Sequence, residues 1–251
     1  MVDIVGAGPG AADLITVRGM RLLSRADRVI YAGSLVNREL LGYTREGCKL
    51  YDSSKMTLDE VIEVIKEAED RGENTVRLHT GDPSIYGAIR EQTDRLDDLG
   101  IKYRICPGVS SFCGAAAALG AEYTLPGGPQ TVILTRRGGR TAVPEGESIE
   151  RLAAHRASMV IFLSTSMAQE LEGELIAGGY SGDTPAAVVY KATWEDERVL
   201  RCTVGTLGET VRAAGISKTA LITVGDFLGE STQVSKLYDP EFSTGYRKAV
   251  K

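Results

Sequence analysis

The sequence predicts an α/β protein with two α/β domains: a parallel-sheet N-terminal domain and a mixed-sheet C-terminal domain. In residues 1–122 short apolar runs alternate with stretches of helical periodicity, which favours a parallel sheet. The pattern changes after segment 125–129 (LPGGP), and two later apolar runs lie too close together for an intervening helix. We predict domains over 1–122 and 130–240, followed by a loose tail over 241–251.

The N-terminal domain is expected to repeat strand, glycine-containing loop and helix. Strands are expected at Val2–Val5, Arg28–Ala32, Thr75–His79 and Lys102–Cys106. Thr57 and Glu60 form a capping box ahead of an apolar stripe, which predicts a helix ending at Gly72. Further helices are expected over Thr16–Ala26, from an N-cap at Asp82 with Pro83 at N1 to Leu99, and from the Ser110-Ser111 region to Gly120.

The C-terminal domain is expected to contain a hairpin within its sheet. Its strands are expected at Gln130–Thr135, Met159–Leu163, Ala186–Tyr190, Val199–Thr203 and Ala220–Val224, and its helices near Ser166–Ala177 and Thr206–Ala214. The third and fourth strands form the hairpin, so antiparallel pairs should accompany any parallel ones and make the sheet mixed.

Charge and apolar patterning narrow the possible partners. The chain of 251 residues has a net charge of −5, which argues against a nucleic-acid partner. No apolar run approaches the about 18 residues that suggest a membrane span, so no membrane partner is expected. The N-terminus lacks a basic region before an apolar one and is not expected to be a signal peptide, which favours a cytoplasmic location.

Four cysteines without a CxxC motif and only two histidines give no metal-site pattern, so no metal is expected. We interpret the cysteines as small buried hydrophobic residues in a reducing compartment.

Glycine is unusually abundant: 29 of 251 residues, or about 12%, are glycine, against about 7% on average. The loop from Gly6 to Gly10 (GAGPG) partly fits a dinucleotide-binding fingerprint. Pro9 and the interval before Thr16 delay the following helix, however, and Ala32 stands near the next strand end without an acid for a ribose. Three interpretations stay open: a tight turn, a nicotinamide or flavin site, and a loop lining the cleft of another ligand.

Two further loops follow predicted strands. Asp82, in Thr80-Gly81-Asp82-Pro83, is suited to a ribose hydroxyl or an ammonium group and would repel phosphate, although it could simply cap its helix. Ser110 and Ser111 follow the next strand with small side chains and free backbone amides. Because the carboxyl ends of neighbouring parallel strands form the ligand crevice, these loops favour a nucleoside without phosphate.

Candidate residues in the second half are basic or aromatic. Arg136, Arg137 and Arg140 follow a predicted strand and suit substrate carboxylates, with a solvated arginine turn as the alternative. Lys191 and Trp194 are candidates in the hairpin loop. No Ser/His/Asp or Cys/His set is recognisable, and His79 is as consistent with packing as with function, so no catalytic residue is assigned.

Taken together, these loops resemble the tetrapyrrole (corrin/porphyrin) methylase family over nearly the whole chain. The matching segments are the GAGPG loop with Leu14-Ile15-Thr16, Tyr31–Val36, Thr80–Gly87, Pro107–Ser111, Gln130–Arg136 and Val189–Trp194. Within the family they look most like the branch of cobalamin biosynthesis that methylates precorrin-4, with or without cobalt, at C11. Ala32 stands where the uroporphyrinogen-III enzymes have Asp, which argues against that branch, and Ala11 stands where the family usually has Asp.

The resemblance implies two α/β domains with S-adenosylmethionine in the cleft between them, S-adenosylhomocysteine as a product, a tetrapyrrole substrate and a homodimer. It places the cofactor at Pro9, Thr80, Gly81, Asp82, Ile85, Tyr86, Ser110, Ser111, Leu163 and Ala192, and the substrate at Gly8, Gly10 and Arg136. A Rossmann-type NAD(P) oxidoreductase and a non-catalytic nucleoside or tetrapyrrole carrier are the alternatives from other classes.

Overall fold

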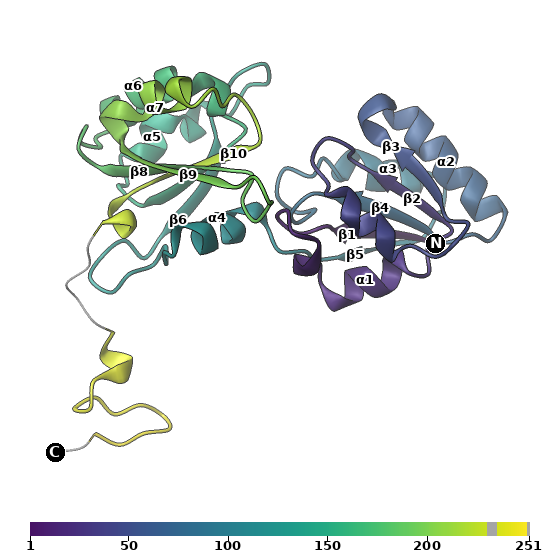
Figure 1. Cartoon of the computed structure of the whole chain (residues 1–251), viewed down its shortest axis with the longest axis horizontal. Helices are drawn as coiled ribbons and strands as arrows, with labels where there is room; N and C mark the ends of the chain where they lie inside the picture. Colours follow the sequence, from purple (N-terminus) through teal and green to yellow (C-terminus); the bar gives the residue numbers. More distant parts are fainter. Residues whose placement is uncertain (230–234, 250–251) are drawn as a thin grey trace. The chain divides into compact units, whose positions relative to one another are not determined.

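The computed structural model describes residues 1–229 and 235–249, which form two compact units (Figure 1). The first comprises Met1–Ala115 with Lys191–Glu197, and the second comprises Ala116–Tyr190 with Arg198–Lys251. The short segment 191–197 therefore groups with the first unit, although it connects two strands of the second. The predicted boundaries at 122 and 130 and the loose tail stay predictions, and residues 250 and 251 of that tail lie outside the described residues.

The first unit contains a five-stranded sheet of order β3-β2-β4-β1-β5, in which every pair is parallel, as predicted. Its strands are β1 (Val2–Gly6), β2 (Arg28–Tyr31), β3 (Lys49–Asp52), β4 (Thr75–His79) and β5 (Tyr103–Cys106). The edge strand β3 was not expected, because its four residues are half exposed and begin and end in a charge. All five strands end at one edge of the sheet, so the loops after β4, β1 and β5 are neighbours.

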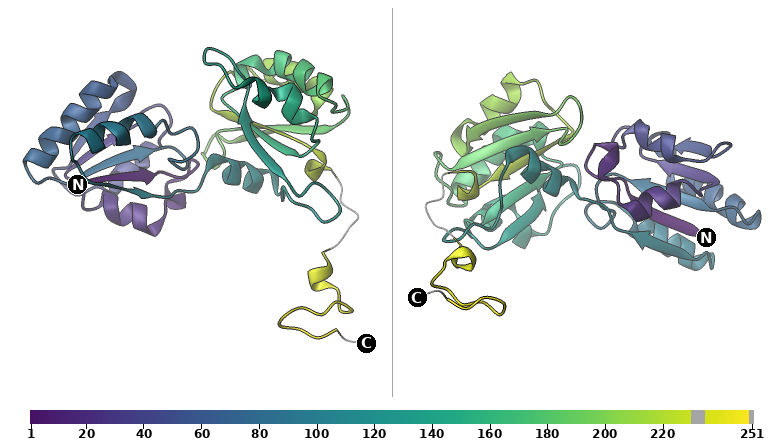
Figure 2. Two further views of the ribbon diagram at one scale, coloured as in Figure 1. Left: turned by 180° about the vertical axis from the view of Figure 1, so that it is seen from behind. Right: turned by 60° about the horizontal axis from the view of Figure 1, so that its bottom comes forward.

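Helices cover both faces of this sheet (Figure 2). On one face α1 (Val17–Leu23) packs on Val5, Val29 and Leu78. On the other, α2 (Leu58–Asp70) and α3 (Arg90–Asp98) pack on Val2, Ile4 and Ile30. The predicted capping box of α2 is confirmed: the Thr57 side chain accepts from the Glu60 amide, and the Glu60 carboxylate accepts from the Thr57 amide.

The predicted helix from Asp82 to Leu99 is wrong in its first half, since α3 begins only at Arg90. Tyr86 and Ala88 have positive φ angles of 53° and 48°, outside the right-handed helical region. A Cβ added at Gly87 would lie 2.2 Å from the Pro83 carbonyl oxygen, so residues 83–87 form a turn too tight for a helix. Asp82 consequently caps no helix.

The second unit contains the predicted mixed sheet, of order β6-β7-β10-β8-β9. Only β6 and β7 are parallel, and β8 and β9 form the expected hairpin. The strands are β6 (Val132–Arg136), β7 (Ser158–Phe162), β8 (Pro185–Tyr190), β9 (Arg198–Thr203) and β10 (Ala220–Val224). Helices α5 (Ile149–Ala153), α6 (Ala168–Ala177) and α7 (Leu207–Ala213) share one core with the sheet, and the five-residue α5 was not expected.

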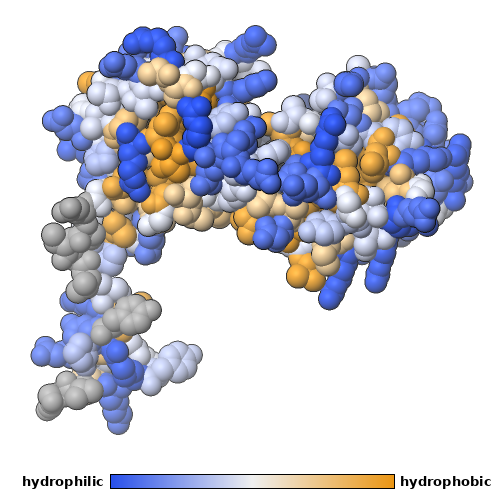
Figure 3. All heavy atoms as spheres, viewed as in Figure 1, coloured by the Kyte–Doolittle hydropathy of each residue, from blue (hydrophilic) through white to orange (hydrophobic). Residues whose placement is uncertain are grey.

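One further helix, α4 (Ser111–Leu119), is the predicted alanine-rich helix. None of the helices within 1–229 and 235–249 has the length and apolar character of a bilayer-spanning segment. Apolar side chains reach the surface of both units among hydrophilic ones (Figure 3).

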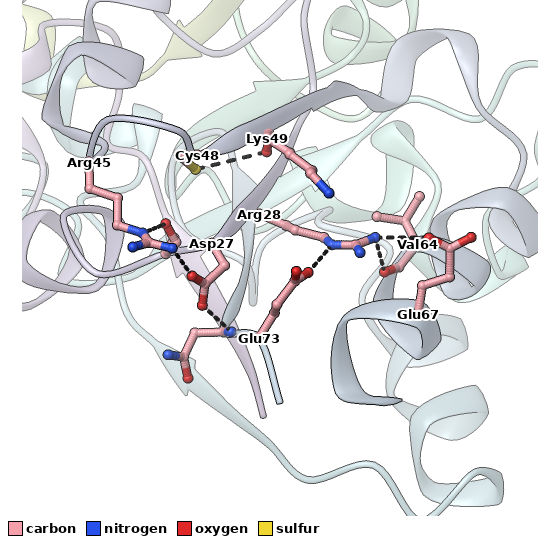
Figure 4. Close-up of polar contacts among 10 residues, drawn as sticks. Asp27, Arg28, Arg45, Cys48, Lys49, Val64, Glu67 and Glu73 are labelled. Carbon is pink, nitrogen blue, oxygen red and sulfur yellow. Dashed lines mark hydrogen bonds and ion pairs between the residues drawn. The ribbon is translucent and has the colours of Figure 1, made fainter. Parts of the chain in front are cut away.

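A buried arginine ties α2 to the first sheet (Figure 4). The side chain of Arg28 on β2 is only 1% exposed, and its Nε lies 2.6 Å from the Glu73 carboxylate. Its Nη1 donates to the Val64 carbonyl and to the Glu67 carboxylate, each at 3.2 Å. Glu73 is 26% exposed and Glu67 is 52% exposed, so Glu73 is the less solvated partner of the buried charge.

We expect Glu73→Ala to lower the free energy of unfolding by about 3 kcal/mol, because it removes the closer partner of a buried charge. Glu67→Ala is the matched control and should cost under about 1 kcal/mol, because Glu67 is 52% exposed and lies farther from the guanidinium. Urea unfolding followed by circular dichroism measures both variants. Equal losses would contradict the importance assigned to the Glu73 contact.

Candidate functional site

The loops after β1, β4 and β5 meet backbone to backbone. Gly8 and Gly81 exchange two hydrogen bonds, with N–O distances of 3.2 and 2.8 Å. A Cβ added at Gly108 would lie 2.2 Å from the Gly81 carbonyl oxygen and 2.7 Å from the Gly6 Cα. No side chain fits between these backbones, so the glycines in all three loops serve a close approach. Of the three interpretations of the GAGPG loop, this contact supports the tight turn directly.

Asp82 connects two of these loops. Its Oδ2 accepts from the Gly108 amide at 2.8 Å, and its Oδ1 accepts from the Ser84 amide at 2.8 Å and from the Ser84 hydroxyl. Burial alone would raise the pKa of Asp82, but the hydrogen bonds from Ser84 and Gly108 outweigh it and lower the pKa below its usual value. The carboxylate is therefore ionised at neutral pH, at the carboxyl edge of the sheet.

The turn after Asp82 carries Ile85 and Tyr86. The Ile85 amide donates to the Asp82 carbonyl at 3.2 Å, and the side chain of Tyr86 is 45% exposed. Just before the turn, the Thr80 hydroxyl donates to the Leu35 carbonyl at 3.1 Å. The predicted cofactor residues Thr80, Gly81, Asp82, Ile85 and Tyr86 thus follow β4 as one short, tightly folded segment.

Segment 191–197 lies against the GAGPG loop. A Cβ added at Gly10 would lie 2.2 Å from the Trp194 ring, and the Ala11 amide donates to the Thr193 hydroxyl at 3.0 Å. The Lys191 ammonium lies 5.4 Å from the centre of the Trp194 ring. The structure therefore brings the hairpin-loop candidates to Gly10. It also adds Thr193, which sequence analysis missed because nothing in the local pattern distinguishes it.

The start of α4 completes this group of loops. Ser110 is buried, and its carbonyl accepts from the amides of Cys113 and Gly114. A Cβ added at Gly114 would lie 2.7 Å from Pro9 Cβ and 3.5 Å from Ala192 Cβ. Gly114 is thus a second residue that sequence analysis missed: it allows α4 to approach both Pro9 and Ala192.

Leu163 and Arg136 belong to the second unit, whereas the other predicted cofactor and substrate contacts belong to the first. Arg136 is the last residue of β6 and Leu163 follows β7, and these two strands are parallel neighbours with Arg136 opposite Phe162 in the register. Leu163 has a φ of 54° and is 67% exposed, an unusual conformation and exposure for a leucine. These two residues are neighbours at the ends of β6 and β7.

The arginines after β6 differ in their partners. Arg136 donates to the carbonyls of Thr141 and Ala142 at 3.1 and 2.8 Å, which are neutral acceptors. Arg137 instead pairs with the Glu174 carboxylate at 2.7 Å, so its charge is compensated. Among the described residues neither Arg136 nor Arg140 has an acidic partner within 4.0 Å, and of the two it is Arg136 that lies at the end of the strand.

His79 is a packed residue. Burial, and then the nearby charge of Arg77, lowers its pKa to about 3, so it is neutral at physiological pH. Its Nε2 has no hydrogen-bond partner within the described part of the chain.

The interpretation of all four cysteines as buried residues is wrong for Cys113, which is exposed near the start of α4. Cys106 is buried, and the other two are half buried.

Comparison with known proteins identifies the family. The family model of the tetrapyrrole (corrin/porphyrin) methylases matches residues 1–208. The chain belongs to the tetrapyrrole methylase family. This confirms the resemblance carried by the loop motifs and accounts for the two sheets of different topology.

Individual tetrapyrrole methylases match over nearly their whole length. The cobalt-precorrin-4 C(11)-methyltransferase of Methanocaldococcus jannaschii is 51% identical over 251 residues, covering 100% of this chain and 97% of the relative. The precorrin-4 C(11)-methyltransferase of Rhodococcus erythropolis is 46% identical, covering 90% of this chain and 91% of the relative. The X-ray structure of the cobalt precorrin-4 methyltransferase CbiF superposes with a TM-score of 0.89 at 45% identity, covering 91% of this chain and 96% of that one.

We expect the stability of this methylase to fall as the pH drops from about 6.5 towards 5. The folded state holds the pKa of His79 near 3, whereas the unfolded chain takes up a proton near 6.5. The stabilisation is therefore complete above 6.5 and decreases by about 1.4 kcal/mol per pH unit below it. Urea unfolding of the wild type and of His79→Gln at pH 7 and 5.5 measures the effect.

Asp52 and Glu60 have lowered pKa values and titrate below this pH range. They therefore do not affect the comparison between the wild type and His79→Gln. The His79→Gln variant should lose about 1 kcal/mol less between the two pH values than the wild type does. Equal losses in both proteins would show that folding does not lower the pKa of His79.

Proposed function

We propose that the chain is an S-adenosylmethionine-dependent methyltransferase that methylates C11 of cobalt-precorrin-4 in cobalamin biosynthesis, on the anaerobic route where cobalt is inserted early. The observation that carries the proposal is the 51% identity, over the full chain, to a relative of that name. The grouping of the first unit's candidate residues near the carboxyl edge of its sheet supports it as well.

The residues after β1, β4 and β5 fit S-adenosylmethionine. Asp82 is an ionised acceptor for a ribose hydroxyl or an ammonium group, and both groups occur in this cofactor. The glycine contacts bring these three loops together at one edge of the sheet, and the first α-helix after Gly10 begins only at Val17, as suits a ligand without phosphate. Pro9, Ser110, Ser111 and Ala192 are the further cofactor contacts that we propose in the first unit, and Leu163 is the one that we propose in the second.

Arg136 is the proposed contact for a substrate carboxylate. Its guanidinium is held by backbone carbonyls, which orient the group without neutralising it. An oriented guanidinium binds a carboxylate through two parallel hydrogen bonds, so a polycarboxylate macrocycle is a suitable partner. Gly8 and Gly10 would contact the macrocycle through backbone atoms, because the space beside Gly10 is occupied by the Trp194 ring.

The proposed chemistry requires no protein nucleophile. S-adenosylmethionine supplies a methyl group on a positively charged sulfur, and the residues around it would align this group with the ring carbon. Alignment of two bound reactants is a large source of rate by itself. The neutral, buried His79 and the hydrogen-bonded Asp82 are consistent with a site that binds and orients.

A metal-free substrate is the second candidate. The Rhodococcus erythropolis relative is named for precorrin-4 without cobalt and is 46% identical, so both substrates belong in the same assay. We also propose that the enzyme is a cytoplasmic homodimer, as the family resemblance implies.

Transfer of a radiolabelled methyl group from S-adenosylmethionine tests the proposal. We expect label in the product with cobalt-precorrin-4, and a lower kcat/KM with precorrin-4. A higher kcat/KM with precorrin-4 would assign the metal-free reaction instead. If neither product carries label, tight NADH binding would favour the oxidoreductase. Ligand binding without turnover would favour the carrier.

We expect Asp82→Ala to weaken the binding of S-adenosylhomocysteine about tenfold or more, because it removes both the ionised acceptor and the contact to Gly108. Ser84→Ala is the matched control. It removes one hydroxyl donor to Asp82 but leaves the Ser84 amide and the Gly108 contact in place, so affinity should change less than about twofold. Isothermal titration calorimetry measures both, and unchanged affinity in Asp82→Ala would refute the placement.

A further inference from the structure

A buried arginine without an acidic partner lies beneath the proposed cofactor loop. Arg77 is in the middle of β4, and its side chain is on the face of the sheet that packs on α2 and α3. The residue is 8% exposed, and the described residues offer it no carboxylate within 4.0 Å. Burial lowers its pKa to about 10, so it remains a cation at neutral pH. An apolar residue at this position would avoid the free-energy cost of burying a charge, so we expect the guanidinium to have a specific role.

The partners of Arg77 are both neutral. Its Nη1 donates to the Ile30 carbonyl on β2 at 3.2 Å, and its Nε donates to Oε1 of Gln92 at 3.0 Å. Gln92 is on the first turn of α3 and is 7% exposed. Its Nε2 donates in turn to the Ala88 carbonyl at 3.0 Å. A chain of hydrogen bonds thus runs from the sheet, through two buried side chains, to the end of the loop that follows Asp82.

Gln92 is chemically suited to this relay. A guanidinium only donates hydrogen bonds and a backbone carbonyl only accepts them, so the residue between them must do both. The amide oxygen therefore faces Arg77 and the amide nitrogen faces Ala88. A glutamate of the same shape would satisfy Arg77 but would place a carboxylate oxygen against the Ala88 carbonyl.

The relay is attached to the end of a segment with an unusual backbone conformation. Ala88 and Tyr86 have positive φ angles, and the helix that follows has no side-chain cap at its N-cap residue Ile89. Asp82 fixes the start of this loop through Gly108, and Gln92 fixes its end through Ala88. Ile85 and Tyr86 lie between these two attachments.

We propose that Arg77 and Gln92 are positioning residues, which hold the loop over residues 83–89 in the conformation that places Ile85 and Tyr86 against the cofactor. The inference rests on the proposed function, because it takes these two residues as contacts for S-adenosylmethionine. It adds two residues that no motif of the sequence singled out and that do not themselves touch the ligand.

Gln92→Glu separates positioning from stability. The new carboxylate forms an ion pair with Arg77, so the Tm should stay the same or rise. The hold on Ala88 is lost, so the Kd for S-adenosylhomocysteine should rise about fivefold or more, as expected for one hydrogen bond. The KM for S-adenosylmethionine should rise in parallel, while kcat at saturating cofactor stays within about twofold, because the residues act on binding.

Gln130→Glu is the matched control. Gln130 also donates its side-chain amide to a backbone carbonyl, that of Leu125 at 2.6 Å, but it lies in the second unit and outside the proposed site. The substitution makes the same change of charge and removes the same kind of hydrogen bond. Its Kd for S-adenosylhomocysteine should equal that of the wild type.

A second variant covers the case in which Gln92→Glu lowers the Tm. The double substitution Arg77→Met with Gln92→Met replaces the whole polar pair by apolar side chains of similar length, which is close to neutral for stability in other buried pairs. It should show the same rise in Kd, because Ala88 again loses its donor.

Wild-type binding distinguishes the two levels of the proposal. If the wild type fails to bind S-adenosylhomocysteine, the proposed function is wrong. If the wild type binds it, and Gln92→Glu and the double variant bind it equally well with an unchanged Tm, the positioning role is overturned and the relay is merely structural.

Discussion

The contact between the backbones of Gly6, Gly81 and Gly108 is the constraint on which the candidate site depends. Three neighbouring parallel strands deliver their carboxyl ends to the same edge, but only loops without side chains at these positions pack as closely as they do. A methyl group at Gly108 would displace backbone atoms, which cannot give way as the end of a flexible side chain can. The glycines therefore determine the separation of the loops, and the loops determine where every candidate side chain of the first unit lies.

Two of the buried polar residues of the first unit, Arg77 and His79, are on β4, the strand that leads into the loop after Thr80. Val76 and Leu78 face the apolar core with α1, while the alternate residues Arg77 and His79 lie on the opposite face of β4. Burying these two polar side chains lowers the free energy of unfolding relative to a core with apolar residues at the same positions. Gln92 packs on the same face as Arg77 and reaches the end of the loop after Asp82. In our proposal, this buried polar pair therefore supports the shape of the site.

The outcome for individual elements shows where the sequence was sufficient. The capping box at Thr57 and the hairpin of β8 and β9 depend on residues a few positions apart, and both were predicted correctly. Strand β3 is short and half exposed, so its periodicity is weak. The start of α3 was misplaced because Asp82 and Pro83 are good residues for a helix start. The Gly108 amide, 26 positions away, instead engages Asp82, and no local pattern reveals such a partner.

The same distinction applies to the site. Motifs identified Asp82 and Arg136, because a charged side chain next to a predicted strand end indicates its chemistry without knowledge of distant contacts. Thr193, Gly114 and Gln92 were missed, because each matters through a contact with a distant segment and has an ordinary local context. Family resemblance supplied Leu163 and Ala192, and apolar residues of this kind carry no chemical signal of their own.

The geometry around Asp82 also bears on the choice between a nucleoside and a phosphate ligand. Its oxygens already accept three protein donors, which keep the carboxylate ionised and fix its direction before any ligand arrives. A carboxylate has about four acceptor positions, so one remains for a hydroxyl or ammonium hydrogen. The same fixed negative charge opposes a phosphate at that edge of the sheet. The glycine-rich first loop alone suggests a dinucleotide, but the single acid in the loop after the neighbouring strand favours a ligand without phosphate.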